Sequence, residues 1–274
     1  MRLMAVHAHP DDESSKGAAT LARYAAEGVD VLVVTCTGGE RGDVLNPRLN
    51  TPEVRADLPA IRRREMARAR EILGVRHRFL GFRDSGLTDA PPADSFARQP
   101  LHDAVERLVD AIRDFRPDVL VTYDETGGYP HPDHVRTHEV AVAAFDAVAA
   151  TPWRIAKLYY LATLSRPWFQ ALHDAMTARG IDSGMGEVLA ELPETEVAVT
   201  TRVHCADYFD VRDRALRAHE TQVAPDHPFF RHPRDLERAV WPTEDYVLAR
   251  SLVPAEPPED DLFAGIRVAS ADPA

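Results

Sequence analysis

Histidine and carboxylate side chains stand close together near the start of the sequence, in the stretch His7-Ala8-His9-Pro10-Asp11-Asp12-Glu13-Ser14. His9 and Asp12, three residues apart, offer an imidazole nitrogen and a carboxylate oxygen, which are ligand types for zinc and related divalent ions. Asp11 lies between them and cannot easily point the same way, so we expect it to act as a base beside the metal. A catalytic zinc site has three protein ligands and one open position, so this stretch supplies two of the three.

A second group of chemical side chains lies in residues 123–134, which include Tyr129, His131 and His134. Either histidine could be the third ligand of a single metal ion per chain. The other histidine, or Tyr129, could then donate a hydrogen bond to the oxyanion of a tetrahedral intermediate. Because zinc lowers the pKa of its bound water to about 7, these parts together predict metal-assisted hydrolysis of an acyl bond.

Each group directly follows a short apolar stretch that predicts a buried strand. Residues 2–7 precede the first group and residues 119–122 the second, and a predicted helix follows each, at 14–27 and from the second group to about residue 150. Strands that alternate with helices favour a parallel sheet, with functional sites at the carboxyl ends of its strands. We therefore expect an α/β fold with a Rossmann-like, mostly parallel sheet flanked by helices, in which both groups meet at one sheet edge.

The other predicted elements extend this sheet. In the first half they are strands at 29–35 and 76–82 and helices at 52–73 and 101–115. The second half is less regular, with strands at 157–161, 197–203 and 246–252 and helices at 168–179 and 207–222. We expect one catalytic domain over 1–274, with a core at 1–150 that carries the metal site and an irregular α+β portion at 151–274 that caps the active site.

Composition limits the class of protein. The formal net charge of the 274 residues is −12, which argues against nucleic-acid binding because such binding depends on excess lysine and arginine. Two cysteines are too few for a disulfide scaffold. No apolar run of about 18 residues and no signal-peptide pattern before the first strand are present, so we expect a cytoplasmic protein that does not bind membranes. A small-molecule substrate is the expected partner, and a homo-oligomer is left open.

Each feature also has a structural alternative. A metal could hold together a non-catalytic protein that binds a thiol or a sugar, but such a site would be closed by four ligands, and only three good ligands are apparent. By residue type alone, Lys16 would be a solvated side chain, Arg62 a helix-surface charge and Asp84 a turn residue. The pairing of two His/Asp groups, each after a buried strand, favours the metal site.

The two groups resemble the signatures of a known family. Residues 8–13 read Ala-His-Pro-Asp-Asp-Glu and residues 131–134 read His-Pro-Asp-His, the two motifs of the zinc-dependent N-acetylglucosaminyl-phosphatidylinositol deacetylase-like family. The resemblance extends over essentially the whole chain, through Ser14-Ser15-Lys16-Gly17-Ala18-Ala19-Thr20, His219-Glu220-Thr221-Gln222, Trp241-Pro242-Thr243-Glu244 and Asp261-Leu262-Phe263-Ala264-Gly265.

The resemblance implies a zinc ion on His9, Asp12 and His134, with Asp11 as the general base. Fe²⁺ accepts the same two nitrogen ligands and one oxygen ligand and is the alternative metal.

For the remaining residues of the second group, the resemblance implies roles in the reaction. His131 would stabilise the oxyanion or protonate the leaving amine, Tyr129 would polarise the carbonyl, and Asp133 would tune His131.

On the substrate side, the resemblance implies that Lys16 contacts a cysteinyl group and that Asp43, Arg62 and Asp84 hold a glucosaminyl-inositol group. The implied activity is hydrolysis of the amide bond of mycothiol S-conjugates to glucosaminyl-inositol and a mercapturic acid, a detoxification reaction of actinobacteria. The alternatives are deacetylation of N-acetylglucosaminyl-inositol in mycothiol biosynthesis and a natural-product pathway amidase that acts on mycothiol adducts. Lys16 separates the amidase from the deacetylase, because an acetyl substrate has no cysteinyl group to contact.

Overall fold

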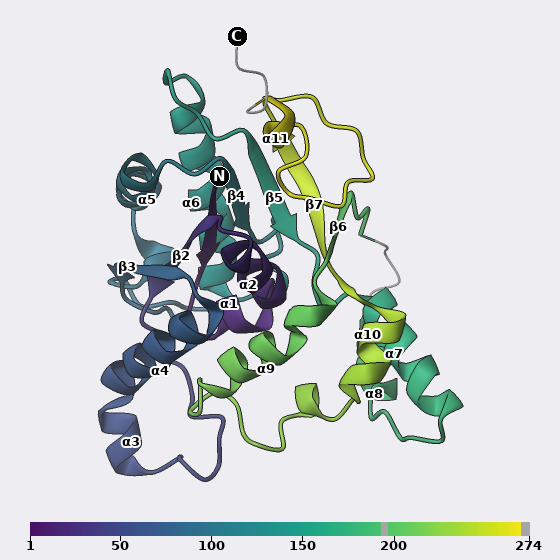
Figure 1. The fold of residues 1–274 in the computed structure, drawn as a ribbon. Helices are drawn as coiled ribbons and strands as arrows, with labels where there is room; N and C mark the ends of the chain where they lie inside the picture. The colour runs from purple at the N-terminus through teal and green to yellow at the C-terminus, as the bar shows by residue number, and fades with distance from the viewer. Residues whose placement is uncertain (193–196, 270–274) are drawn as a thin grey trace.

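One mixed sheet runs through the protein, whose computed structural model describes residues 1–192 and 197–269. Within these residues the strand order is β3-β2-β1-β4-β5-β7-β6 (Figure 1). Adjacent strands within the set β1 to β5 are parallel, and β7 runs antiparallel to both β5 and β6. The strands are β1 (Arg2–His7), β2 (Asp30–Thr37), β3 (Arg76–Phe82), β4 (Val119–Thr122), β5 (Lys157–Leu161), β6 (Thr201–His204) and β7 (Thr243–Ser251).

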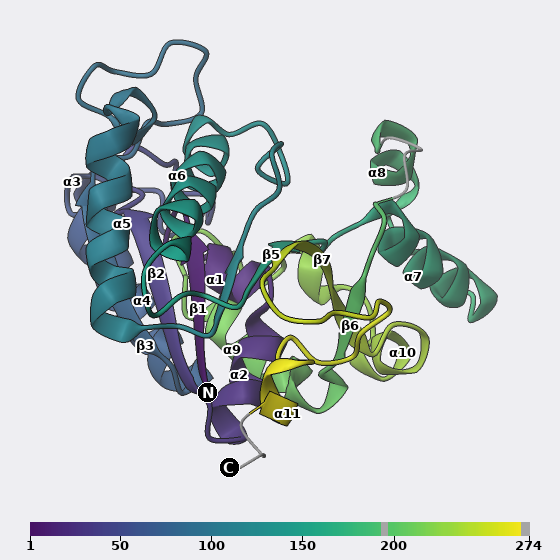
Figure 2. The ribbon, with the colours of Figure 1, turned by 90° about the horizontal axis from the view of Figure 1, so that it is seen from above.

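Helices cover both faces of the sheet, so its central strands are buried on two sides. In β1, Leu3 and Ala5 point into one apolar core while Met4 and Val6 point into the other. This double burial explains why the central strands are continuous apolar runs in the sequence. The helices of the first core are α2 (Ala18–Ala26), α4 (Leu58–Leu73) and α9 (Phe209–Arg217), and those of the second are α5 (Leu101–Phe115) and α6 (Pro132–Ala149) (Figure 2).

A satellite group of helices lies beside the β7–β6 end of the sheet (Figure 1). It consists of α7 (Arg166–Ala178), α8 (Gly186–Glu191) and α10 (Arg234–Val240), which share a small apolar core around Trp168, Leu172 and Leu236. Short helices complete the chain: α1 (Asp12–Ser15), α3 (Pro52–Ala56), α11 (Ile266–Ala269) and the 3-10 turns Phe96–Arg98, Ala206–Tyr208 and Pro228–Phe230. Within residues 1–192 and 197–269, no helix has the length and apolar character needed to cross a bilayer.

The C-terminal segment returns to the sheet and completes the first core. The carboxylate of Glu259 accepts hydrogen bonds from the fully buried Lys157 ammonium at 2.6 Å and from the Tyr159 hydroxyl at 2.6 Å. On α2, the hydroxyl of Tyr24 donates to Asp261 at 2.7 Å, and the Tyr24 ring packs edge-on against Phe263.

The predicted α/β class and the mostly parallel sheet are confirmed, but several boundaries differ. The helix predicted at 14–27 is broken into α1 and α2 because Gly17 adopts a φ of +86°, a conformation that ends a helix. The helix predicted at 52–73 is split at Asp57, since Pro59 starts the new helix α4. Three short helices, α8, α10 and α11, were not predicted.

The second half differs more. The helix predicted at 207–222 ends at Arg217. The strand predicted at 197–203 begins only at Thr201, and the strand predicted at 246–252 begins earlier, at Thr243. The three strands of this half extend the same sheet as β1 to β4.

Candidate active site

The exits of β1 and β4, which are neighbours in the sheet, bring the two predicted groups together. His9 follows β1, His134 lies in the first turn of α6 after β4, and the centres of their rings are 5.3 Å apart. The chain leaves β1 toward β2 on one side, whereas β4 lies on its other side, so the strand order reverses at this point. Open α/β sheets form their ligand sites at such positions.

Three ligand atoms converge at this edge. Asp12 Oδ2 lies 3.4 Å from His9 Nδ1 and 3.3 Å from His134 Nε2. The ligand atoms of all three residues lie within 4.8 Å of one another, and the three side chains are buried. Among the described residues, His134 Nε2 has no hydrogen-bond partner although it is buried. Burying the lone pair of this nitrogen beside a carboxylate is energetically unfavourable unless both bind a cation. The three residues therefore fit a divalent metal ion.

In both metal-facing histidines, His9 and His134, one ring nitrogen faces Asp12 (the inner nitrogen) and the other faces away from it (the outer nitrogen). Each outer nitrogen contacts a hydrogen-bond acceptor of the protein. His134 Nδ1 lies 2.9 Å from the Gly127 carbonyl oxygen, and His9 Nε2 lies 3.1 Å from Asp133 Oδ2. When these outer nitrogens donate hydrogen bonds, the inner nitrogens keep their lone pairs for a metal. Metal-binding histidines in other proteins are commonly held in this way by a carboxylate or a backbone carbonyl. Gly127 must be glycine here, because a Cβ on it would lie 2.6 Å from the Cβ of His134.

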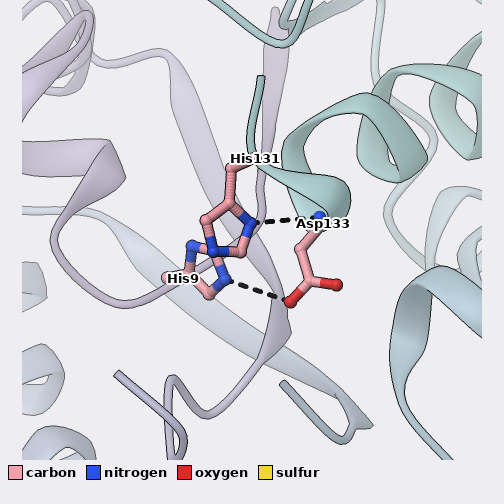
Figure 3. Close-up of side chains that lie close together, drawn as sticks. All are labelled: His9, His131 and Asp133. Carbon is pink, nitrogen blue, oxygen red and sulfur yellow. Dashed lines mark hydrogen bonds and ion pairs between the residues drawn. The ribbon is translucent and has the colours of Figure 1, made fainter. Parts of the chain in front are cut away.

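A second triangle, formed by His9, His131 and Asp133, also places ligand atoms within 4.8 Å of one another (Figure 3). Its atoms are already engaged: His131 Nδ1 accepts the backbone N–H of Asp133 at 3.1 Å, and the Asp133 carboxylate accepts from His9 and from the Ser85 N–H at 2.9 Å. The unsatisfied His134 nitrogen therefore favours the His9–Asp12–His134 set.

The tuning of His131 by Asp133 stays a prediction, and the geometry shows where the Asp133 carboxylate lies. That carboxylate lies on His9 and Ser85, and Asp133 reaches His131 through its backbone N–H (Figure 3). Asp133 directly follows Pro132 in the first turn of α6, and its side chain points to the ring of His9.

Lys16 lies at the edge of the ligand cluster. Its Nζ donates to Asp12 Oδ1 at 2.8 Å and lies 5.9 Å from the centre of the Tyr129 ring. Burial opposes ionisation of Asp12, but His134 and Lys16 outweigh it and hold the pKa of this carboxyl well below its usual range. Asp12 is therefore an anion, as a metal ligand must be.

Asp11 adopts a strained backbone conformation, with φ 109° and ψ −27°. Its N–H donates to Glu13 Oε2 at 2.9 Å, and its Oδ2 accepts from Arg62 Nη2 at 3.1 Å. Burial raises the pKa of the Asp11 carboxyl, and the charge of Arg62 opposes this rise. The Asp11 side chain is 24% exposed whereas that of Asp12 is 4% exposed, so Asp11 is the carboxylate that solvent or substrate can reach.

His131 and Tyr129 complete the rim. The His131 ring centre is 4.6 Å from that of His9, and burial together with the proximity of His9 lowers its pKa to about 4. His131 is thus neutral at pH 7, and because its Nδ1 accepts a hydrogen bond, its proton resides on Nε2. The Tyr129 ring centre lies 4.5 Å from that of His134, and its side chain is exposed.

The three residues expected to hold the amine side of a substrate lie in different surroundings. Arg62 is buried and donates to the carbonyl oxygens of Pro10 and Gly39 as well as to Asp11. Asp84 is buried, lies 3.6 Å from His9 Nε2 and accepts from the N–H groups of Arg41 and Gly86. Asp43 is exposed on the loop after β2.

Sequence reasoning assigned no role to a buried pair beneath Asp11. His219 Nε2 lies 2.8 Å from Glu13 Oε1, and both side chains are fully buried. Glu13 in turn accepts the Asp11 N–H, so the pair supports the backbone of the predicted base. The two residues are 206 positions apart, and spacing in the sequence could not reveal such a contact.

The chain is similar to known proteins over most of its length. Residues 4–145 match the family described as PIG-L, GlcNAc-PI de-N-acetylase. A mycothiol S-conjugate amidase from Streptomyces coelicolor is 50% identical to this chain, over 97% of this chain and 98% of the relative. A 1D-myo-inositol 2-acetamido-2-deoxy-alpha-D-glucopyranoside deacetylase from Streptomyces avermitilis is 40% identical over 97% of each chain.

Among solved structures, a conserved protein from Thermus thermophilus superposes with a TM-score of 0.60 at 24% identity, over 92% of this chain and 96% of the other, which supports the fold. The family match covers both His/Asp groups, which the fold brings together at one edge. The chain therefore belongs to the GlcNAc-PI de-N-acetylase family.

Proposed function

We propose that this protein is an amidase that hydrolyses the amide bond of mycothiol S-conjugates to glucosaminyl-inositol and a mercapturic acid, in the detoxification of electrophiles. The observation that carries the proposal is the position of Lys16, whose ammonium lies 2.8 Å from a carboxylate of the metal-ligand set. A cationic side chain at that place can contact the polar groups of a cysteinyl residue whose carbonyl is under attack. The 50% identity with the Streptomyces coelicolor amidase supports the same substrate.

The metal is assigned to His9, Asp12 and His134, with Zn²⁺ as the proposed ion and Fe²⁺ as the alternative that the same ligands accept. When bound, such an ion supplies Lewis-acid polarisation of the amide carbonyl and activation of a water molecule.

Asp11 is proposed to take the proton of the attacking water. Its carboxylate is the exposed member of the Asp11–Asp12 pair, and Arg62 and Glu13 fix its position from two sides. A base that is held in place loses little conformational freedom when it acts, which favours catalysis.

His131 is proposed to donate its Nε2 proton to the oxyanion or to the leaving amine. The hydrogen bond from the Asp133 N–H fixes this tautomer, so the proton is presented at the free nitrogen. Tyr129, exposed beside it, would polarise the carbonyl. Asp133 would tune His131, to which its backbone N–H donates, while its carboxylate orients His9.

The two halves of the substrate would lie on opposite sides of the ligand cluster. Asp84 and Asp43 follow β3 and β2 on one side, where we propose that they bind the glucosaminyl-inositol half. Arg62 would support this side through Gly39 and Asp11. Lys16 faces Tyr129, which follows β4 on the other side, where the cysteinyl half would bind.

The test is a product assay by mass spectrometry on the zinc-loaded protein, with a fluorescent mycothiol S-conjugate and, separately, N-acetylglucosaminyl-inositol. Fast release of the mercapturic acid with slow release of acetate is the expected result. A faster release of acetate would overturn the amidase assignment.

The deacetylase reaction is the second candidate, supported by the 40% identity with the Streptomyces avermitilis enzyme. Lys16→Ala separates the two: the amidase predicts a much larger loss of kcat/KM for the S-conjugate than for the acetyl substrate. An equal loss on both substrates, with metal content retained, would favour the deacetylase. A natural-product pathway amidase would instead show a narrow preference for one mycothiol adduct.

The cellular setting is also proposed. Cys36 and Cys205 are both buried free thiols, which is typical of a reducing compartment, so we propose that the enzyme acts in the cytoplasm. The strands of both halves share one sheet, which supports a single catalytic domain over the whole chain.

A further inference from the structure

A large hollow lies beside the candidate active site, between the loop after β4 and the segment that joins β5 to α7. Its volume is ≈ 540 Å³, enough for an aromatic group of one or two rings. Its apolar lining includes Tyr160, Leu161, Ala162, Leu164 and Val247.

Two contacts connect this hollow to the catalytic residues. Gly128 lines it and directly precedes Tyr129. Leu161 lines it and packs against Gly17, the residue after Lys16: a Cβ on Gly17 would lie 3.2 Å from Leu161 Cδ2. One lining residue is thus next to Tyr129 in the sequence, and another lies against the residue that follows Lys16.

The strand order places the hollow away from the sugar side. Asp84 and Asp43 follow β3 and β2, the ligand cluster follows β1 and β4, and the hollow lies at the exits of β4 and β5. A substrate whose amide carbonyl lies at the cluster would extend its amine half toward β2 and β3 and its acyl half toward β4 and β5.

The charges at the hollow limit what it can bind. Asp124 and Glu125 lie on its wall, and Asp124 Oδ1 accepts from Thr126 and from the Gly128 N–H at 3.0 Å. The guanidinium of Arg166, the basic residue in the lining, donates to the carbonyl oxygens of Leu189 and Leu192. The two carboxylates disfavour an anion, and the apolar residues of the lining accept an uncharged apolar group.

We propose that this hollow binds the sulfur substituent of the substrate and selects uncharged aromatic or aliphatic substituents over small or anionic ones. The proposal rests on the proposed amidase function and extends it to the specificity of the acyl side. Val247, on β7 opposite Tyr160 of β5, is then a specificity-determining residue.

The test compares the S-benzyl and S-methyl conjugates of mycothiol as substrates of the zinc-loaded full-length protein. For the wild type, kcat/KM should be at least about tenfold higher for the benzyl conjugate, the effect of burying one aromatic ring. Val247→Trp fills the hollow and should remove this preference. Val240→Trp, the matched control on α10 outside the hollow, should retain it.

A binding measurement gives a second readout that does not depend on turnover. Calorimetry with N-acetyl-S-benzylcysteine and N-acetyl-S-methylcysteine should show tighter binding of the benzyl compound to the wild type and to Val240→Trp, and equal binding to Val247→Trp. Thr163→Trp, which fills the hollow from the β5–α7 segment, repeats the test if Val247→Trp does not fold.

Failure of this inference differs from failure of the proposed function. Cleavage of both conjugates with an unchanged benzyl preference in Val247→Trp and Thr163→Trp would overturn the hollow as the substituent site alone. Release of acetate from N-acetylglucosaminyl-inositol without cleavage of either conjugate would overturn the amidase function, and the inference with it.

Discussion

At the scale of single residues, the two nitrogens of each metal-facing histidine have different tasks. Gly127 holds the outer nitrogen of His134 and Asp133 holds that of His9, so each ring is fixed before a ligand arrives. This second layer of contacts is what distinguishes the His9–Asp12–His134 set from ordinary buried histidines.

Asp11→Asn tests the predicted base. The amide keeps the size of the side chain and tolerates the strained backbone, but it cannot accept a proton, so kcat should fall by about 10²-fold or more. Metal content, measured by atomic emission, should remain at the wild-type level. Asp12→Asn is the matched control and should lose the metal, and near-normal turnover of metal-loaded Asp11→Asn would contradict the assignment.

At the scale of elements, helix α4 supports the loops that carry the site. Arg62 reaches from α4 to the carbonyl oxygens of Pro10 and Gly39, so one buried guanidinium ties the exit of β1 to the exit of β2. The sequence suggested a helix-surface charge or a substrate contact for Arg62, and the observed contacts are with the protein.

Gly39→Ala tests how much the hydrogen bonds of Arg62 to these loops contribute to the free energy of unfolding. Gly39 has φ +64°, and a Cβ on it would lie 2.1 Å from Arg62 Nη1, so the substitution must displace the guanidinium. Gly28→Ala is the matched control, because Gly28 has φ +83° but no atom within 4 Å of its Cβ. Backbone strain alone should cost about 1–2 kcal/mol in both variants.

The displaced guanidinium should add about 1.5–3 kcal/mol to the loss of stability in Gly39→Ala, since hydrogen bonds of a charged group are broken. Urea denaturation gives both free energies of unfolding. If both variants lose the same free energy of unfolding, the contacts of Arg62 do not stabilise the loops after β1 and β2.

A buried ion cluster joins α9 to α10. Arg212 contacts Glu237 through two hydrogen bonds of 2.9 and 2.8 Å, and Arg234 and His232 contact the same carboxylate. Burial disfavours the ionised form of Glu237, but His232 and Arg212 outweigh it and hold the pKa of this carboxyl well below its usual range.

The shift predicts a pH dependence of stability. Because the pKa of Glu237 is lower in the folded state than in the unfolded state, its stabilisation is complete above the unfolded pKa of about 4.5 and is lost as the pH falls below it. Between about pH 5 and about pH 3, a range around the ordinary pKa of a glutamate, the Tm of the wild type should therefore decrease more steeply than the Tm of Glu237→Gln. Parallel curves of Tm against pH for the two proteins would contradict this contribution.

At the scale of the whole molecule, metal binding and folding should be coupled. The ligands follow two strands that come together only in the folded sheet, so the native state binds the metal far better than the unfolded chain. At a free metal concentration of about 1,000 times Kd, the added stability is about 4 kcal/mol.

Chelation should therefore lower Tm by roughly 10 °C for a chain of this size. Differential scanning calorimetry with and without a chelator measures the shift. His134→Ala is the control and should show no response to the chelator, whereas an unchanged wild-type Tm would argue against a bound metal.

Much of the site could be predicted from sequence because its information is local. His9 and Asp12 lie within one turn, His131 and His134 within another, and each pair follows an apolar strand that marks its place in the sheet. The general topology of parallel sheets predicted that both groups lie at one sheet edge, whereas the direct pairing of β1 with β4 is seen only in the structure.

The other features depend on contacts between distant segments. The orientation of Asp133 toward His9, the support of Glu13 by His219 and the hollow beside Leu161 each join residues that no spacing rule connects. The short helices α8 and α10 were missed because six or seven residues carry too little periodicity to be detected.

The return of the C-terminal segment has a consequence for synthesis on the ribosome. Lys157 is fully buried and its ammonium is neutralised by Glu259, which is translated 102 residues later. Because translation adds about 5–20 residues per second, Glu259 is synthesised roughly 5–20 s after Lys157. Until then, burying Lys157 would leave an unpaired charge inside the sheet. The nascent chain therefore should keep β5 exposed to solvent, and to chaperones, until Glu259 has left the exit tunnel.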